Sequence, residues 1–365
     1  MPQGCDHDHE GGPLDPVEVL DRIVYLLDRR LEEGRRVRAY ANARDLVADL
    51  DADELLARHQ DGTLTELPGI GPATSAVIAE SLAGKVPKKL AELEATNPVE
   101  VGEGGALRAA LRGDCHLHSE WSDGGAPIER MAEAARALGH EYVVLTDHSP
   151  RLTVAHGLDA ERLRRQLDVI DELNAAYRRD GVGFRILTGI EVDILADGTL
   201  DQDEELLARL DVVVASVHSK LSMDAKEMTR RMVMAVASPH VDILGHCTGQ
   251  KLPGRMRPIG QSDFAGRVGS TFDADVVFAA CARFDTAVEI NCRPERMDPP
   301  DHLLELALEW GCKLAIDTDA HAPGQLEWQP FGCDKAARQG VSAEQVVNTW
   351  SAGELVEWAA SHPTS

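Results

Sequence analysis

The stretch IERMAEAARALGHEYVVLTDH, residues 128–148, contains in one unit the pattern that decides the fold. Residues 128–138 have apolar side chains at helical spacing, and they stop at Gly139, a residue type favoured just past the end of a helix. Residues 142–146 are apolar and partly β-branched, as in a buried strand, and His148 follows them. The stretch therefore predicts a helix and then a buried strand that ends in a polar side chain.

The same alternation of strand and helix runs from residue 113 to residue 316. We expect strands over residues 113–117, 142–146, 185–192, 212–217, 241–245, 287–291 and 313–316. We expect the main helices over residues 128–138, 160–177, 225–236, 274–284 and 303–310. Strands that alternate with helices of ~10–15 residues predict βαβ units and a parallel sheet. A barrel and an open doubly wound sheet both satisfy this pattern.

The polar residues at the strand ends distinguish these two folds. The segments are CHLH (115–118), LTDH (145–148), GIEVD (189–193), ASVH (215–218), ILGH (243–246), EIN (289–291) and DTDAH (317–321). A barrel brings the C-terminal ends of all its strands to one rim, whereas an open sheet spreads them along an edge. We therefore expect an α/β fold, a (β/α) barrel with seven strands.

Nine residues at or just after these strand ends have side chains that bind Zn²⁺, Mn²⁺ or Fe. They are His116, His118, Asp123, His148, Glu191, His218, His246, Asp319 and His321. Nine ligands exceed the four or six that one ion takes, so the sequence predicts more than one metal ion. Five other histidines lie in helix or loop contexts and are predicted to be surface residues: His59, His140, His240, His302 and His362.

The composition narrows the class of protein. The chain has 365 residues and a formal net charge of −25, which argues against broad binding to nucleic acid unless bound cations reverse the local field. The first residues have neither a basic nor an apolar leader segment, and no run of ~18 apolar residues could span a membrane. The seven cysteines are scattered without C-x-x-C spacing, as in a protein with reduced thiols. We expect a cytoplasmic protein without a membrane anchor, and the sequence does not indicate its oligomeric state.

Before the barrel, the pattern is helical throughout. We expect a disordered tail over residues 1–13, a small all-α domain over 14–98, a linker over 99–112 and the barrel domain over 113–365. The helical segment contains LPGIG, residues 67–71, in which two glycines permit a tight turn. The N–H groups of the following helix suit a DNA phosphate, although a plain helix-turn-helix corner would also use glycine for steric reasons.

The phrase LPGIG and the apolar helix after it resemble the helix-hairpin-helix motif. Residues 14–97, which include RVRAY at 36–40, are similar to the small N-terminal domain of family X DNA polymerases. This resemblance implies a DNA-binding domain whose contacts to phosphate come from Gly69, Gly71, Lys85 and Arg38. Some members of that family carry a Schiff-base lysine where this chain has Val77, so the resemblance does not extend to lyase activity.

The strand-end motifs resemble those of the PHP (polymerase and histidinol phosphatase) family, above all the PHP domain of bacterial family X polymerases. The similar segments are DCHLHSEWSDG (114–124), LTDHS (145–149), GIEVDI (189–194), SVHS (216–219), HVDILGHCTG (240–249), VEINCRPERMD (288–298) and DTDAH (317–321). The resemblance implies a distorted seven-stranded barrel with a trinuclear metal site. It departs from the family pattern at Cys247, at Asp317 and at Gln250, where an arginine is common.

The resemblance also implies how three divalent ions, Zn, Mn or Fe, would be held. The first would be bound by His116, His118, Glu191 and Asp319. The second would share Glu191 and add His218 and His246, and the third would take Asp123, His148 and His321. We expect Asp114 and Asp193 to orient ligand imidazoles. Four basic residues are candidates for binding substrate phosphate: Lys220, Arg255, Arg257 and Arg293.

A metal-bound hydroxide at such a site would hydrolyse phosphoester bonds. The connector over residues 98–112 is too short for a polymerase module, so polymerase activity is excluded. The first hypothesis is a DNA-directed phosphoesterase of DNA repair: a 3′-exonuclease, a 3′-phosphatase or an abasic-site endonuclease. The second is a small-molecule phosphatase acting on histidinol phosphate or a nucleotide. The third is a non-catalytic DNA-binding adaptor, against which the full set of nine ligands argues.

Overall fold

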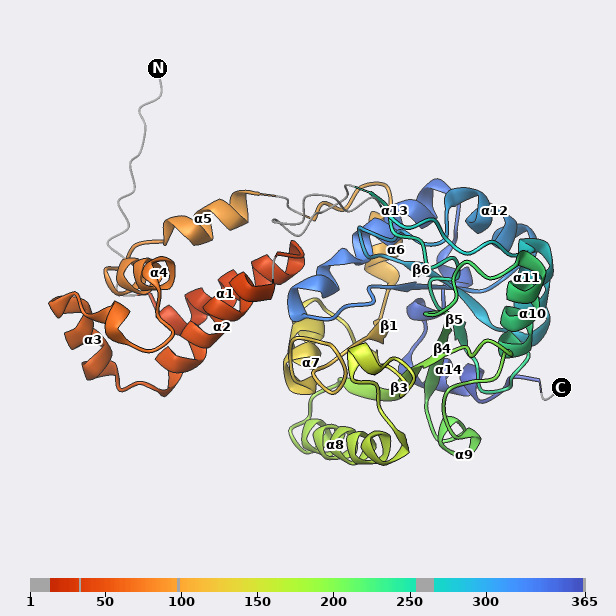
Figure 1. Cartoon of the computed structure of the whole chain (residues 1–365), viewed down its shortest axis with the longest axis horizontal. Coiled ribbons are helices and arrows are strands. Elements are labelled where there is room, and N and C mark those ends of the chain that lie inside the picture. The colour runs from red at the N-terminus through yellow and green to blue at the C-terminus, as the bar shows by residue number, and fades with distance from the viewer. Residues whose placement is uncertain (1–13, 33, 97–98, 254–265, 364–365) are drawn as a thin grey trace, which may run out of the picture. The chain divides into compact units, whose positions relative to one another are not determined.

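The structure, a computed structural model, describes residues 14–32, 34–96, 99–253 and 266–363. The described chain forms two compact units, residues 14–96 and residues 99–363, which are coloured red to orange and orange to blue in Figure 1. Each unit is described by itself below. Arg255 and Arg257, the tail histidines and Cys5 lie outside the described residues.

The first unit is helical, as its pattern predicts. Its helices are α1 (Pro16–Arg29), α2 (Gly34–Asp49), α3 (Ala52–Asp61), α4 (Pro72–Leu82) and α5 (Lys88–Ala95), with a 3₁₀ turn at Leu64–Glu66. The side chains of Asp15 and Asp51 accept hydrogen bonds from the first N–H groups of α1 and α3, which caps both helices. The fully buried core includes Leu20, Ile23, Leu26, Leu27, Ile78 and Leu93.

The turn before α4 has the backbone geometry that its two glycines suggest. Gly69 has a φ of +88°, and a Cβ built on Gly69 or Gly71 would meet no atom within 4 Å. The buried side chains of Leu67 and Ile70 anchor the turn to the core. Thr74 fixes its far end, because the Thr74 hydroxyl accepts a hydrogen bond from the Gly71 N–H at 3.0 Å. The exposed backbone of the turn can therefore approach a ligand closely.

The second unit is a parallel barrel. Its strands are β1 (Gly113–Leu117), β2 (Tyr142–Leu145), β3 (Arg185–Asp193), β4 (Val212–Ser216), β5 (Ile243–Leu244), β6 (Ala287–Asn291) and β7 (Leu314–Asp317). They are hydrogen-bonded in the order β1 to β7, and the His118 N–H after β1 donates to the Ala320 carbonyl after β7 at 2.8 Å. The expected seven-stranded (β/α) barrel is confirmed, and its strands lie inside a ring of helices (Figure 1).

Five helices between the strands fall close to their predicted positions: α7 (Ile128–Ala137), α8 (Ala160–Arg179), α10 (Ala225–Val236), α11 (Ala274–Phe284) and α12 (Asp301–Glu309). A sixth, the short α9 (Glu204–Leu207), was not predicted. Along β2, Val143 and Leu145 pack outward against α7 and α8, whereas Tyr142 and Val144 point into the barrel. This period of two explains why the strands are apolar on both faces.

Three further helices of this unit lie outside the predicted set: α6 (Gly105–Ala110), α13 (Gln329–Arg338) and α14 (Ala352–Ala359). The remaining short 3₁₀ helices are Thr153–Ala155, Pro323–Trp328, Ala343–Gln345 and Val347–Thr349. Helix α6 falls within the expected linker, and the Gly104 N–H before it donates to the Asp334 carboxylate on α13 at 2.8 Å. The segment just before β1 is therefore hydrogen-bonded to the barrel unit and is part of it.

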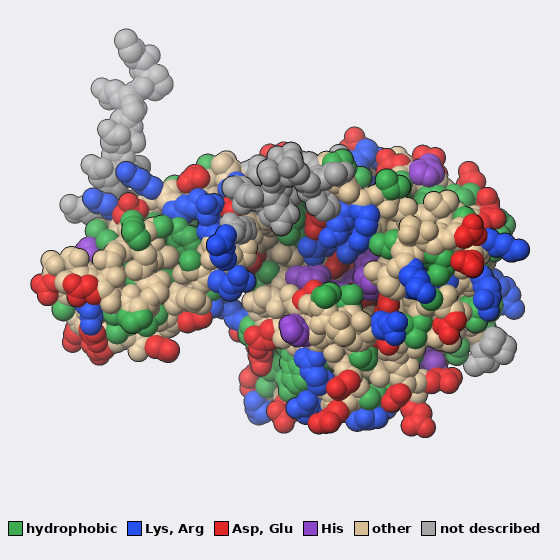
Figure 2. Space-filling view, in the orientation of Figure 1, with side chains coloured by type: hydrophobic (Ala, Val, Ile, Leu, Met, Phe, Trp, Pro, Cys, Tyr) green, Lys and Arg blue, Asp and Glu red, His purple; other side chains and the backbone are tan. Residues whose placement is uncertain are grey.

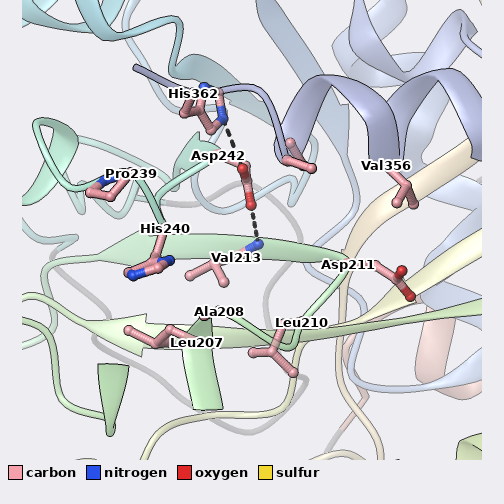
Figure 3. Close-up of a pocket in the computed structure, with 12 residues that line it drawn as sticks. Leu207, Ala208, Leu210, Asp211, Val213, Pro239, His240, Asp242, Val356 and His362 are labelled. Carbon is pink, nitrogen blue, oxygen red and sulfur yellow. Dashed lines mark hydrogen bonds and ion pairs between the residues drawn. The ribbon is translucent and has the colours of Figure 1, made fainter. Parts of the chain in front are cut away.

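Helix α14 closes the end of the barrel at which the strands begin. Its Leu355 and Trp358 belong to the same core as Val212 and Ile243. Beyond the helix, His362 pairs with Asp242 at 2.8 Å, and Asp242 also accepts a hydrogen bond from the Val213 N–H at 2.6 Å (Figure 3). The prediction of a surface position for His362 is wrong, because the segment after α14 folds back over a cavity of about 320 Å³.

His140 is also buried, contrary to prediction, because the chain turns inward after Gly139 to enter β2. Both ring nitrogens of His140 lack a hydrogen-bond partner among the described residues. Burial, together with the positive charge of Arg108, lowers the pKa of this imidazole to about 3. His59, His240 and His302 keep partly or fully exposed positions, as expected.

The buried His140 predicts a loss of stability in acid. Its pKa is lower in the folded than in the unfolded chain, so below pH ~6.5 the unfolded state binds the additional proton. The stability that the neutral His140 contributes is fully present above that pH. It falls by about 1.4 kcal/mol per pH unit below it, so that about 2 kcal/mol of stability is lost at pH 5. We expect His140→Leu to flatten the pH dependence of urea unfolding between pH 5 and 7 relative to the wild type. An unchanged slope would contradict the assignment.

Candidate metal centre

Glu191, in the last part of β3, lies at the middle of the rim where the strands end. Its carboxylate is within 2.8 Å of His148 Nδ1, 2.9 Å of His246 Nε2 and 3.1 Å of His218 Nε2. His116 Nε2 and His118 Nε2 follow at 3.5 and 3.6 Å. Five imidazoles from β1, β4, β5 and the loop after β2 thus surround one buried carboxylate.

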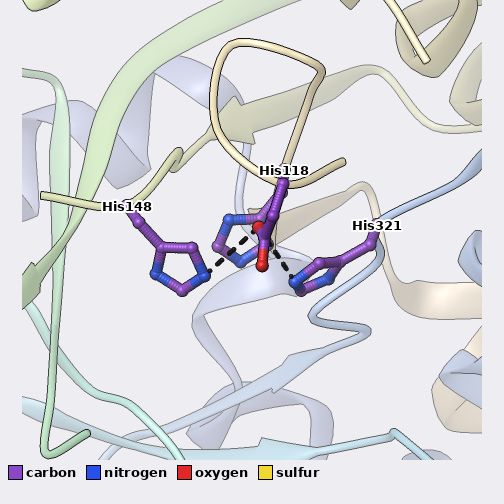
Figure 4. A group of neighbouring side chains, drawn as sticks. His118, His148 and His321 are labelled. Atoms are coloured by element: carbon purple, nitrogen blue, oxygen red, sulfur yellow. Dashed lines mark ion pairs between the residues drawn. The ribbon is translucent and has the colours of Figure 1, made fainter. Parts of the chain in front are cut away.

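A second group of side chains adjoins the first. His148 Nε2 and His321 Nε2 each lie 3.4 Å from Asp123 Oδ1, and His118 completes the group (Figure 4). The rings of His118 and His321 are 4.2 Å apart between centroids. Ligand atoms of these four residues all lie within 4.8 Å of one another, as do those of His116, His118 and Glu191, and those of His148, Glu191 and His218.

Asp319 connects the two groups from the end of β7. Its Oδ1 lies 3.5 Å from His118 Nε2 and 3.5 Å from His321 Nδ1, and Asn291 donates to its Oδ2 at 3.1 Å. Asp319 also has a φ of +50°, a strained backbone conformation that often marks a functional site. The structure thus brings all nine sequence-predicted ligands together. Their division among individual ions stays a prediction.

The residues that orient the imidazoles differ in part from the expected ones. Asp114 accepts a hydrogen bond from the His116 N–H at 3.0 Å and from the Thr318 hydroxyl, so it does not touch the His116 ring. Glu289, in β6, holds that ring instead, at 2.6 Å from Nδ1. Asp193 is 3.5 Å from His218 Nδ1, as expected for an orienting carboxylate.

Charges within the cluster shift its protonation equilibria. Burial favours the neutral form of Glu191, but the surrounding His218, His116 and His148 lower its pKa well below the usual value. Burial likewise opposes protonation of His218, yet Glu191 and Asp193 raise the pKa of His218 to about 9. The pKa of His118 falls well below its usual value through burial and the neighbouring His321 and His148. The ionised carboxylates of the site are therefore stabilised by positive charge close by, from protonated histidines such as His218.

Two arginines from the loop after β6 border the cluster. Arg293 lies over the Trp328 ring at 5.4 Å, and its Nη1 donates to the Asp319 carbonyl at 2.7 Å. Arg296 Nε is 3.3 Å from Asp319 Oδ2 and has no hydrogen-bond partner among the described residues. In Figure 2, histidines and basic side chains meet in a hollow on the visible face of the barrel unit.

The other residues considered for phosphate binding have different surroundings. Lys220 is exposed and has a φ of +53°, and within the described chain no hydrogen bond or ion pair joins its side chain to the cluster. The amide nitrogen of Gln250 donates to the Arg296 carbonyl at 3.1 Å, so this side chain supports the arginine loop. Lys251 was missed by sequence reasoning. Burial, with Arg296 and Arg293 close by, lowers the pKa of Lys251.

The residues present fit a group of divalent cations. Ring nitrogens of His116, His118, His148, His218 and His246, and Oε2 of Glu191, are buried without a hydrogen-bond partner among the described residues. His148 Nδ1 lies 2.8 Å from a Glu191 oxygen without the angle of a hydrogen bond, so two lone pairs face the same space. Imidazole and carboxylate donors that meet in this way are the ligand set of Zn²⁺, Mn²⁺ and Fe.

This fit predicts that metal stabilises the folded barrel. Adding Mn²⁺ or Zn²⁺ at about 100 times its Kd to chelator-treated protein should stabilise it by about 2.7 kcal/mol, because only the folded chain presents the cluster. The measurement is a thermal melt with and without metal. Mg²⁺, which prefers oxygen ligands, should shift the melt less. Equal shifts with all three metals would argue against a histidine-rich site.

Comparison with known proteins identifies this unit. Residues 114–250 match the PHP domain. This match confirms the predicted resemblance for that part of the chain.

Relatives with similar sequences include a DNA polymerase/3′-5′ exonuclease PolX from Bacillus subtilis, which is 40% identical over 241 residues. That alignment covers 66% of this chain and 40% of the Bacillus protein, so the chain spans well under half of that relative. A probable phosphatase from Thermoanaerobacter sp. is 27% identical over 259 residues, which cover 67% of this chain and 93% of the relative.

A similar solved structure is histidinol phosphate phosphatase from Lactococcus lactis in complex with zinc, L-histidinol and phosphate. It has a TM-score of 0.41 and 17% sequence identity, and the match covers 64% of this chain and 95% of that one. Separately, none of the helices in the described ranges combines the length and the apolar character needed to cross a membrane.

Proposed function

We propose that this protein is a metal-dependent phosphoesterase that hydrolyses phosphoester bonds at DNA ends or lesions. The observation that carries the proposal is the convergence of six imidazoles and three carboxylates, Glu191 among them, in one cluster with two arginines at its border. A cluster of this composition suits phosphate, because both the cations it would hold and the arginines attract phosphate oxygens.

Different residues of the chain would bind the metal ions and orient their ligands. The nine strand-end ligands would hold three divalent ions, Zn, Mn or Fe, in the sets given above. When bound, such ions lower the pKa of water and stabilise the oxygens of an in-line displacement at phosphorus. Glu289 and Asp193 keep the rings of His116 and His218 in place, so that the ligand set stays preorganised.

Arg293 and Arg296 would bind and orient the phosphate group. Arg293 is restrained by Trp328 and by Glu295, whose carboxylate lies 2.8 Å from its Nε, so little side-chain freedom is lost on binding. Arg296 has donor capacity to spare, since its Nε is buried without a hydrogen-bond partner in the described chain. Lys220, Arg255 and Arg257 remain candidates for further contacts.

The helical unit supports DNA as the substrate. The open turn at Gly69 and Gly71 precedes the 11-residue helix α4, whose N-terminal dipole favours an anion. Lys85 and Arg38 are exposed in the same unit. The Bacillus relative is named as a polymerase and 3′-5′ exonuclease, which agrees with this choice and with a role in DNA repair.

A small-molecule phosphatase is the second candidate. It is favoured by the Thermoanaerobacter relative, because the match with this chain covers 93% of that probable phosphatase. The two candidates differ in what the helical unit does.

The deciding experiment compares substrates on the full-length protein with Mn²⁺. We expect release of nucleotide or phosphate from 3′-ended DNA at a kcat/KM well above that for histidinol phosphate, and complete inhibition by EDTA. A preference for histidinol phosphate would select the second candidate. Metal-independent turnover, or none on either substrate, would reject a PHP phosphoesterase.

Lys85→Glu tests the helical unit directly. We expect KM for a DNA substrate to rise about three- to tenfold at low salt, because one contact to phosphate is lost and a repulsive charge is added. Hydrolysis of a chromogenic ester without DNA should stay unchanged. The matched control is Arg58→Glu, a charge reversal on α3 of the same unit. Equal losses in both variants would indicate a general electrostatic effect rather than a contact at the hairpin.

A further inference from the structure

A second cavity lies beside the arginine loop, apart from the metal ligands. It has a volume of about 330 Å³, near the lower end of the ~300–1,000 Å³ typical of ligand pockets. Its walls come from the segment after β5, the segment before α11 and the start of α12. The lining includes Thr248, Gln250, Ser270, Phe272, His302 and Leu303.

Two chains of contacts place this cavity next to the metal centre. Gln250 donates to the carbonyl of Arg296, whose Nε reaches Asp319 at 3.3 Å. Thr248 donates to Asp298 at 2.6 Å, and the Asp298 carbonyl accepts from Asn291, which in turn donates to Asp319. Thr248 also follows the predicted ligand His246 by two residues. Thr248 and Gln250 therefore join the wall of the cavity to the loop that borders the cluster.

The cavity offers hydrogen bonds but almost no charge. Ser270 is nine-tenths buried, and its hydroxyl has no hydrogen-bond partner among the described residues. A buried hydroxyl left unpaired is costly, so a ligand that supplies a partner gains from it. Among the described residues, the lining contains neither a carboxylate nor a lysine or arginine, and His302 at the exposed edge is the one titratable side chain of this described lining.

The apolar part of the wall is held in place. Phe272 packs edge to face against Phe278 of α11, with ring centroids 6.4 Å apart and an interplanar angle of 88°. Leu303 lines the cavity with it. A lining that combines an aromatic and an aliphatic side chain with a hydroxyl suits a flat heterocycle with its own donors and acceptors.

We propose that this cavity binds the nucleobase of the nucleotide whose phosphate is hydrolysed at the metal centre. The proposal rests on the proposed function and specifies its substrate class. An amino alcohol such as histidinol would leave its ammonium group without a carboxylate partner here, whereas a neutral base needs none. The cavity therefore favours nucleotide ends over small amino-alcohol phosphates.

The test uses two chromogenic diesters that share a leaving group. In thymidine 5′-(4-nitrophenyl phosphate) and in bis(4-nitrophenyl) phosphate, water adds to phosphorus, the P–O bond to 4-nitrophenolate breaks, and the released proton passes to solvent. Only the first ester carries a nucleobase. The variants are Ser270→Met, which fills the cavity, and Ser270→Ala, which removes the hydroxyl. Val276→Met, at an exposed position of α11, is the control.

With Mn²⁺, we expect Ser270→Met to raise KM for the thymidine ester about tenfold or more, with kcat little changed. Ser270→Ala should lower kcat/KM for this ester about two- to tenfold, as expected for one hydrogen bond. Neither variant should change kcat/KM for the bis ester by more than about twofold. Val276→Met should leave both esters unaffected.

Each other outcome counts against the proposal in a distinguishable way. Parallel losses on both esters would mean that Ser270 only supports the fold of the rim. Unchanged kinetics on the thymidine ester in both Ser270 variants would mean that the base lies elsewhere, and both results would leave the phosphoesterase proposal standing. Failure of the wild type to hydrolyse either ester would reject the proposed function and this inference together.

Discussion

Glu191→Gln is expected to abolish metal-dependent phosphoester hydrolysis, with a loss of about 10³-fold or more in kcat. Loss of an outer partner of a ligand alone typically costs 10–100-fold, and Glu191 is itself in contact with five imidazoles. The amide has the same shape but no charge, so it balances neither protonated histidines nor bound cations. Metal content, measured by elemental analysis after gel filtration, should fall together with the rate.

The matched control for this change is Glu204→Gln. Glu204 also faces an imidazole, that of His240 at 3.6 Å, but its side chain is 86% exposed and lies outside the cluster. It should keep wild-type activity and metal content. Full activity of Glu191→Gln would contradict the central position of this carboxylate, and loss of activity with normal metal content would assign it a role other than metal binding.

The second large effect concerns stability. Trp328→Ala should destabilise the barrel unit by about 3–5 kcal/mol, since Trp328 is completely buried and alanine would leave a cavity. The side chain also supports Arg293 from below the cluster. We therefore expect KM for a phosphate ester to rise in the variant even at temperatures where the protein remains folded.

Urea unfolding followed by circular dichroism measures the first effect, and steady-state kinetics at low temperature measure the second. Trp310→Ala is the control, because Trp310 ends α12 with 44% of its surface exposed. It should cost less than about 1 kcal/mol, as surface substitutions usually do. A similar cost for both tryptophans would contradict the packing described here.

Much of the barrel could be predicted because its signals are local. Strands β1 and β6 and helices α10 and α11 have the predicted bounds, since apolar runs and helical spacing are read from neighbouring residues. The candidate ligands could be found because they lie in the last part of a buried strand or in the segment that follows it. Closure into a barrel was inferred from the polar residues at the C-terminal ends of the strands. That inference needed all seven strands together rather than any one of them.

What the sequence did not reveal depends on contacts between distant residues. Glu289 is 173 residues from His116, and only the folded barrel brings its carboxylate to the ring. The burial of His362 depends on α14. Among the described residues no strand follows this helix, so it lies outside the alternation of strands and helices from which the fold was predicted. Asp114 was expected at the His116 ring, but it binds the backbone instead, because Thr318 holds its other oxygen.

The seam between β1 and β7 has a consequence for biosynthesis. The first strand after the helical unit is completed only by the last one, through contacts such as those between Asp114 and Thr318 and between Cys115 and Asp317. On the ribosome, the early histidines must wait until about two hundred further residues have been translated before they meet Asp319 and His321. A nascent chain therefore exposes an unclosed sheet edge until β7 has been made, and the group of His118, Asp123, His148 and His321 can be completed only after that strand.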